Sequence, residues 1–355
     1  MNNILFGPFI GEFGWELCYW QGWVRKYSKS FSNSKIYISS FEKSYPLYQD
    51  FVDKFIPISK KFVDKKYSLN GYFPNFKILS EKEKKIFKDL YEQEIVRLKE
   101  IVKKENDNEI IHLPFYPQRN RNKFSHLTFL IKQILKINND NVINKENPYK
   151  GIVIENYLDF LINNYEKAWD VQVPPKDFQI INHLRPTNKV NDLYKKIRQK
   201  VNSKHFVTLF PRKRDIFRPA RNYSENKWEI FIKRLVDDLK LGVFICGTPE
   251  GAGLKQFKYY NVYNTAFEQE KNLLDLQIAL LCNSKYSIHS QSGSAYLPMY
   301  TGNYTFFFGL ENYRKRFDGD NVLNSKYKFL TNYGTDPDPM HLFEEFKKIY
   351  LKDLG

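Results

Sequence analysis

Cysteine, glycine and proline are scarce in this chain, and long hydrophobic runs are missing. Three cysteines in 355 residues, Cys18, Cys246 and Cys282, are too few and too scattered for a disulfide framework or a zinc cage. Sixteen glycines and sixteen prolines exclude a collagen-like or low-complexity chain. The longest apolar runs, such as 305–310, are far shorter than a membrane span, and no signal-peptide pattern opens the chain. We therefore expect a cytoplasmic protein without a transmembrane segment, with peripheral membrane contact left open.

Acidic residues are also under-represented, since 40 of them face 56 basic residues and leave a net charge of +16. Such an excess favours polyanionic partners, although frequent Lys, Asn and Ile are also what an AT-rich genome would give. Two segments concentrate the charge. No acid occurs between Glu109 and Asp140, where five basic residues lie, and 204–221 holds six basic residues against Asp215 alone.

Short apolar runs alternate with helical patterns along both halves of the chain. In the second half, the strand-like runs are 206–210, 243–246, 261–265, 285–289 and 305–310. In the first half they are 4–9, 35–40, 55–58 and 110–115, with a charged amphipathic helix over 81–105. This alternation predicts α/β architecture with parallel sheets, and the length predicts two Rossmann-like domains. A last helix, at about 341–351, has no obvious place in the second sheet.

A glycine-rich loop follows the first predicted strand. Gly7, Gly11 and Gly14 permit tight turns and close approach to a ligand, but their spacing fails the G-x-G-x-x-G dinucleotide fingerprint. Glu12 and Glu16 stand where a helix begins. Glu16 is best explained as a complement to the helix dipole, whereas Glu12, flanked by glycines, is a candidate catalytic base.

A cluster of basic residues follows the strand at 206–210. Guanidinium forks beyond a strand end suit a diphosphate, which predicts phosphate binding by Arg212, Lys213, Arg214 and Arg221. The alternative is a solvated basic loop that touches nucleic acid.

A third loop, with small polar residues, follows the strand at 285–289. Ser290, Ser292, Gly293 and Ser294 can offer hydroxyls and backbone amides to an anion, but the P-loop lysine is missing and an ordinary helix cap is the alternative. Gly247 and Thr248 add a possible nucleoside contact after the strand at 243–246. No histidine spacing indicates a metal site, and the Asp318-Gly319-Asp320 run reads as a turn.

With these three loops in place, the chain resembles the two-Rossmann glycosyltransferases of the GT-B fold, and most of all the bacterial heptosyltransferase group. The segment I-G-E-F-G-W-E looks like the group's loop that carries an acidic base, which would be Glu12. V-T-L-F-P-R-K-R and H-S-Q-S-G-S look like its donor-phosphate segments, while the usual acid before the S-G pair is replaced by Ser290-Gln291. The resemblance covers the first 25 residues and most of 205–310. The P-R…R-N run is also similar to fucosyltransferase-like enzymes, so the subfamily stays open.

The resemblance implies an acceptor domain over 1–185 and a donor domain over 186–338 that face a cleft, with 339–355 crossing back to the first domain. It implies metal-independent, inverting transfer of a sugar from a nucleotide-sugar co-substrate to an acceptor hydroxyl, with no cofactor. Glu12 would be the catalytic base. The donor-binding residues would be Gly11, Arg212, Lys213, Arg214, Arg221, Gly247, Thr248, Ser290, Ser292, Gly293 and Ser294. The acceptor-binding residues would be Trp15, Glu16, Arg119 and Arg121.

Three alternatives concern the partner. A nucleic-acid-binding protein would use 117–136 and 204–221 on phosphates, although no helix-turn-helix, zinc or RNP signature is present. The second alternative is a glycosyltransferase that binds nucleic acid, with a modified base of DNA as its acceptor in place of a glycan. A non-catalytic GT-B-like scaffold is the third.

Overall fold

The computed structural model describes residues 2–65, 67, 69–71, 73–114, 162, 184–215, 218–268, 270–314, 325–330 and 334–353. The chain divides into two compact units, Met1–Gln179 and Ile180–Gly355, and each is described by itself. None of the helices in these ranges is long and apolar enough to cross a lipid bilayer.

The first unit is built on a parallel sheet with the strand order β3-β2-β1-β6. Its strands are β1 (Asn3–Phe6), β2 (Lys35–Ser40), β3 (Lys54–Pro57) and β6 (Ile110–Leu113), beside an antiparallel pair, β4 (Leu69–Asn70) and β5 (Phe73–Pro74). Its helices are α1 (Phe13–Trp15), the π-helical η1 (Glu16–Trp20), α2 (Gln21–Ser28), η2 (Lys29–Phe31), η3 (Glu42–Leu47), α3 (Lys60–Asp64) and α4 (Glu81–Glu105).

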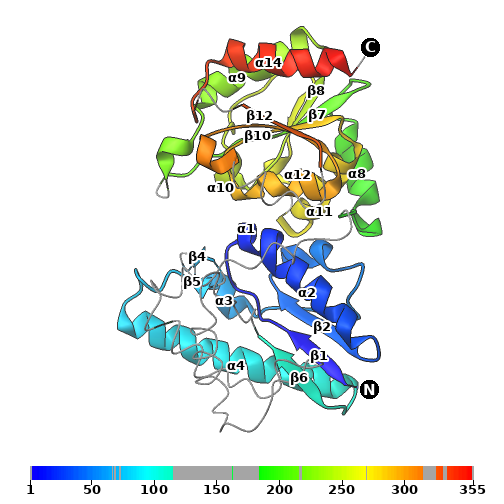
Figure 1. Cartoon of the computed structure of the whole chain (residues 1–355), viewed down its shortest axis with the longest axis vertical. Helices are drawn as coiled ribbons and strands as arrows, with labels where there is room; N and C mark the ends of the chain where they lie inside the picture. The colour runs from blue at the N-terminus through cyan, green and yellow to red at the C-terminus, as the bar shows by residue number, and fades with distance from the viewer. Residues whose placement is uncertain are drawn as a thin grey trace. The chain divides into compact units, whose positions relative to one another are not determined.

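Two helices cover the two faces of this sheet (Figure 1). Leu98 and Val102 of α4 pack with Leu5 of β1 on one face. On the other face, the ring of Trp23 in α2 meets Phe6 edge-on, with centroids 5.4 Å apart. A complete capping box at Ser80 begins α4, the long helix that the charged pattern over 81–105 predicts.

The second unit holds a parallel sheet of six strands in the order β12-β11-β10-β7-β8-β9. Its strands are β7 (Phe206–Phe210), β8 (Gly242–Ile245), β9 (Val262–Asn264), β10 (Tyr286–Ser290), β11 (Tyr304–Phe308) and β12 (Tyr327–Leu330). Counted from β7, this is the doubly wound 3-2-1-4-5-6 order, whose topological switch point lies between β7 and β10. The register there places His289 opposite Phe210.

The helices of the second unit cover both faces of its sheet. They are η5 (Asn188–Val190), α8 (Asn191–Arg198), η6 (Pro219–Arg221), α9 (Glu225–Asp237), α10 (Pro249–Ala252), η7 (Thr265–Phe267), α11 (Glu270–Asn283), η8 (Gly293–Ala295), α12 (Tyr296–Thr301) and α14 (Pro339–Lys352). Helices α9 and α14 lie on one face, and α8, α11 and α12 lie on the other (Figure 1).

The last helix is the main correction to the expected organisation. We expected it to have no place on the second sheet and to cross back to the first domain. Leu342, Phe343 and Phe346 of α14 are instead buried in the core of the second unit, where Phe346 meets Phe231 of α9. The apolar stripe of α14 therefore has its partner within its own unit.

Candidate functional site

The glycine-rich loop is anchored at the carboxyl end of β1. Gly7 has φ +94°, and a Cβ on it would lie 2.4 Å from the carbonyl oxygen of Ser39, so only glycine fits. The amide of Gly7 donates to Leu113 (2.9 Å) and the amide of Phe9 donates to Ser39 (2.9 Å). The loop is thereby held against β6 on one side and β2 on the other. This edge, between β1 and β6, is the switch point of the first sheet.

Glu12 ends this loop as the N-cap residue of α1. Its backbone is extended (φ −71°, ψ 137°), its amide donates to Gly71 (2.9 Å), and its carbonyl accepts from Trp15 and Glu16. The side chain is half-buried and does not cap the helix. Gly11 is buried beside it, and Trp15 is half-buried with its ring 5.2 Å from that of Tyr19. These contacts fix the backbone of Glu12 at the end of the loop that follows β1.

Glu16 lies in the first turn of η1, as expected for a residue that complements the helix dipole. Its side chain is only 1% exposed, which was not expected and leaves little of it on the surface for an acceptor. Its carboxylate accepts hydrogen bonds from the hydroxyls of Ser40, Ser44 (2.6 Å) and Tyr48 (2.7 Å). Burial raises the pKa of Glu16, and the three donors oppose that rise. Glu16 therefore ties the helix after the glycine-rich loop to the segment after β2. The other two predicted acceptor residues, Arg119 and Arg121, lie outside the described residues.

The basic loop after β7 gathers the predicted arginines. Arg212 is 9% exposed, and its guanidinium donates to the side chain of Asn222 (2.5 Å) and to the carbonyl of Arg218 (3.1 Å). Burial, followed by the charges of Arg214, Arg221 and Arg218, lowers the pKa of Arg212 to about 10, so it stays protonated at neutral pH. Burial and Arg218 also lower the pKa of Arg221. Within the described ranges, no carboxylate forms an ion pair with Arg214 or Arg221.

Lys213 lies on the outside of this cluster. Its ammonium forms a 2.6 Å salt bridge with Glu225, which raises its pKa, and both side chains are close to half exposed. Its amide donates to the carbonyl of Gly251 (2.8 Å), which brings the loop after β8 against the basic loop.

Asn222 is a residue that sequence reasoning left without a role. Its side-chain oxygen accepts from Arg212 and from the amide of Arg214 (3.1 Å), and its amide group donates to the carbonyl of Arg214 (2.8 Å). The side chain of Asn222 thus holds the loop closed and orients the guanidinium of Arg212. The only sequence signal was an Asn immediately after the Arg run.

The loop after β10 is tied to the loop after β11. The side-chain oxygen of Gln291 accepts from the amide of Leu310 (3.1 Å), and the Tyr313 hydroxyl donates to the carbonyl of Ser292. Ser292 caps the following turn and shares a hydrogen bond of 2.9 Å with Ser294, while Gly293 is exposed. Tyr313 also lies close enough to Arg212 and Arg221 to raise the pKa of each. Sequence reasoning assigned no individual role to Gln291 or Tyr313, because neither residue type signals a ligand site by itself.

Two buried polar residues end β10 at the switch point. Ser290 is 1% exposed, and its hydroxyl has no hydrogen-bond partner among the described residues. His289 is fully buried and stacked on Phe210, and neither of its ring nitrogens has a partner in the same ranges.

Gly247 and Thr248, the residues after β8 that were predicted to contact the donor, make hydrogen bonds that hold the backbone of their own loop. Gly247 has φ +128°, and its carbonyl accepts from the side chain of Gln277 (2.7 Å). The Thr248 hydroxyl accepts from the amide of Gly251 (3.1 Å) and caps α10. The predicted donor residues of the second unit therefore lie on the loops that follow β7, β8 and β10, at one edge of the sheet.

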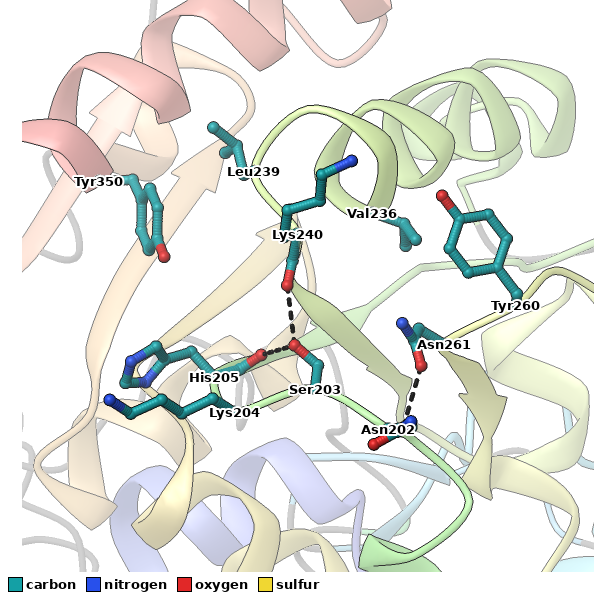
Figure 2. Close-up of a pocket in the computed structure, with 10 residues that line it drawn as sticks. All are labelled: Asn202, Ser203, Lys204, His205, Val236, Leu239, Lys240, Tyr260, Asn261 and Tyr350. Atoms are coloured by element: carbon teal, nitrogen blue, oxygen red, sulfur yellow. Dashed lines mark hydrogen bonds between the residues drawn. The ribbon is translucent and has the colours of Figure 1, made fainter.

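A cavity of about 430 Å³ lies elsewhere in the second unit. Figure 2 shows its lining, which includes His205, Lys240 and Asn261 at the amino ends of β7, β8 and β9. It is at the opposite edge of the sheet from the basic loop. Among the described residues, no group of three or more His, Cys, Asp or Glu side chains is placed to hold a metal ion.

Comparisons with known proteins find matches in fold but not in sequence. No protein-family model matches the chain, and no curated protein matches it. A glycosyl transferase family 9 structure from Veillonella parvula superposes with a TM-score of 0.59 at 12% identity, covering 99% of this chain and 98% of that one. The E. coli ADP-heptose LPS heptosyltransferase II superposes with a TM-score of 0.51 at 15% identity over all of both chains. The chain therefore has the two-Rossmann GT-B fold, in the form shared with heptosyltransferases.

Proposed function

We propose that this protein is a glycosyltransferase that moves a sugar from a nucleotide-sugar donor to an acceptor hydroxyl by inverting displacement. The observation that carries the proposal is the placement of Arg212 and Ser292 on the two sides of the β7–β10 switch point. Ligands of doubly wound sheets bind at this edge. The fold likeness supports the same reaction class, since the two structures named above are those of a glycosyl transferase and a heptosyltransferase.

The donor diphosphate would bind at the basic loop. Arg212 is held in place by Asn222, and Arg221 lies beside it without a carboxylate partner in the described ranges. Repulsion among these cations is relieved by a bound anion, so the loop favours a diphosphate. Gly293 and Ser294 would add backbone amides and a hydroxyl. Lys213, already paired with Glu225, would contribute less.

The chemical step would be one displacement at the anomeric carbon. Glu12 would take the proton of the acceptor hydroxyl as the new C–O bond forms and the bond to the diphosphate breaks. The guanidinium groups would stabilise the negative charge that grows on the leaving diphosphate, so the step needs no metal ion. The acceptor oxygen attacks from the face opposite the leaving diphosphate, so a single displacement inverts the anomeric configuration. We propose a glycan hydroxyl as the acceptor.

The test is a thermal-shift screen of the full chain against nucleoside diphosphates and nucleotide sugars. We expect one nucleotide class to raise the Tm of the wild type and to lose this effect in Arg212→Ala. Arg234→Ala is the matched control, because Arg234 pairs with Asp238 towards the other end of α9. The nucleotide that shifts the Tm then enters transfer assays.

Two outcomes would contradict the proposal. One is no shift with any nucleotide, or equal shifts in wild type and Arg212→Ala. The other is DNA affinity that falls steeply with salt in the absence of nucleotide-sugar binding, which would support the nucleic-acid-binding alternative.

A further inference from the structure

The cavity at the amino edge of the second sheet has the lining of a ligand site. Its volume of about 430 Å³ lies within the range of small-molecule pockets. Buried Val236 and Tyr350, with half-buried Leu239, give it an apolar part. The ring of Tyr260, which is 56% exposed, adds an aromatic surface on the other side (Figure 2).

The charged side chains that line the cavity are all basic. Lys204, His205 and Lys240 line the cavity, and no carboxylate does. In the described part of the chain, none of these three side chains has a hydrogen bond or a salt bridge. Asp237 accepts from the Tyr260 and Tyr259 hydroxyls, which lower its pKa, and the charge of Lys240 adds to that effect. Asp238 pairs with Arg234. In the described ranges, the two lysines therefore have no ion-pair partner at hydrogen-bonding distance.

The backbone around the cavity is held in an unusual conformation. Lys240 (φ 54°) and Asn261 (φ 55°) are two of the four non-glycine residues with positive φ in the described ranges, and both line the cavity. The Lys240 carbonyl accepts from the Ser203 hydroxyl (2.8 Å), and the Asn261 side-chain oxygen accepts from the amide of Asn202 (2.9 Å). These bonds, drawn in Figure 2, leave the amide nitrogen of Asn261 for a ligand.

We propose that this cavity binds a phosphate monoester carried on a ring, as in a nucleoside monophosphate or a sugar phosphate. The ammonium groups of Lys204 and Lys240 point to different sides in Figure 2, so one or both lysine side chains would turn towards the phosphate. The Tyr260 ring and the apolar part would take the ring. The site is separate from the proposed donor site. Strand β7 has five residues, so its length puts the two sites about 17 Å apart. A ligand in the cavity would contact the loops that precede β7, β8 and β9. The basic loop follows β7 at the opposite end of that strand.

The experiment is isothermal titration of the full chain with AMP, glucose 6-phosphate, inorganic phosphate and adenosine. Because AMP could also enter the donor site, the titrations are run in Arg212→Ala as well as in the wild type. We expect one ring phosphate to bind both proteins equally and Lys204→Ala/Lys240→Ala at least about tenfold more weakly. Lys258→Ala, a change at an exposed lysine outside the cavity, should bind as the wild type does. AMP and glucose 6-phosphate distinguish the two sources of the phosphate.

Three results would overturn the proposal: no binding by any probe, binding that survives the double lysine change, or inorganic phosphate binding as tightly as the ring phosphates. The last would mean an adventitious ion only. Tyr260→Ala against Tyr260→Phe checks the ring contact, because the Phe variant keeps the aromatic surface. Nucleotide-sugar binding that is lost in Arg212→Ala but kept in the double lysine variant separates this site from the donor site.

Discussion

The carboxylate of Glu16 and the hydroxyl of Tyr48 lie 2.7 Å apart, joining residues 32 positions distant in the sequence. Both side chains are buried, and Ser40 and Ser44 donate to the same carboxylate. The contact fastens η1, which follows the glycine-rich loop, to the segment after β2. The position of Glu12 therefore depends on a buried polar network four residues further along the chain.

Removing that carboxylate should destabilise the first unit. Glu16→Ala leaves three buried hydroxyl groups without their acceptor, and we expect the free energy of unfolding to fall by about 2–4 kcal/mol. Urea denaturation followed by circular dichroism measures the change. Glu100→Ala, at an exposed position of α4, is the control and should stay within about 0.5 kcal/mol of the wild type. Equal, small effects of both changes would argue against the network.

Glu16 should also give the protein a characteristic pH dependence. Burial raises its pKa above the usual 4.5, so the folded chain holds this proton more tightly than the unfolded chain does. Stability from this group is full at low pH and is lost as the pH rises from about 4.5 through the raised pKa. Glu16→Gln removes the titration, so the stability difference between wild type and variant should shrink with rising pH. Urea denaturation from about pH 4 to about pH 8 measures it, and a difference that grows with pH would contradict the assignment.

Glu12 should separate donor binding from transfer. If Glu12 is the base, Glu12→Gln keeps the loop and the donor site but cannot take the acceptor proton, so transfer should fall by about 10²–10⁴-fold. The Kd for the donor nucleotide should stay the same, as measured by titration. Unchanged transfer would remove Glu12 from the role, and a product with retained anomeric configuration would exclude the single-base scheme.

Asn222 should affect donor binding as a positioning residue. Asn222→Ala frees the guanidinium of Arg212 and opens the contact with Arg214, so we expect the Kd for the donor nucleotide to rise about tenfold. The rate of sugar transfer at saturating donor should change much less, because the proposed catalytic base, Glu12, is unchanged. An unchanged Kd, or a loss of transfer without a change in Kd, would contradict this role.

Strand and loop positions followed from the sequence because their signals are local. FVTLF, VFIC and TFFFGL are short apolar runs with breakers beside them, and each forms or overlaps a strand of the second sheet. The basic loop follows β7 and the loop of small residues follows β10. Because these two parallel strands are neighbours in the sheet, their carboxyl ends lie side by side. The glycine-rich loop, expected after the first strand, falls at the switch point of the first sheet for the same reason.

The remaining features depend on contacts between distant parts of the chain. The burial of Glu16 needs hydroxyls from β2 and η3, and its neighbours in sequence give no sign of them. Helix α14 finds its partner in α9, more than a hundred residues earlier, and β12 pairs with β11 although its own sequence is short and carries a lysine. After α9, Lys240 rather than the nearby Gly242 takes the positive φ. Gly242 begins β8, where a Cβ would lie 2.2 Å from Val201.

His289 should make the protein sensitive to acid. Its imidazole is stacked on Phe210, with centroids 4.4 Å apart, and packed against Phe307. Burial holds its pKa well below the usual 6.5. The unfolded chain therefore binds a proton that the folded chain refuses, and stability is lost as the pH falls below about 6.5, by up to about 1.4 kcal/mol per pH unit for one such group.

Replacing His289 by Phe tests this directly. The variant keeps a ring between the same neighbours, so we expect a shallower loss of stability between about pH 6.5 and about pH 4.5. His112, whose pKa burial lowers to about 4, should maintain part of the slope in the variant. Denaturation curves that keep the full wild-type slope in His289→Phe would show that this histidine is not the group that titrates.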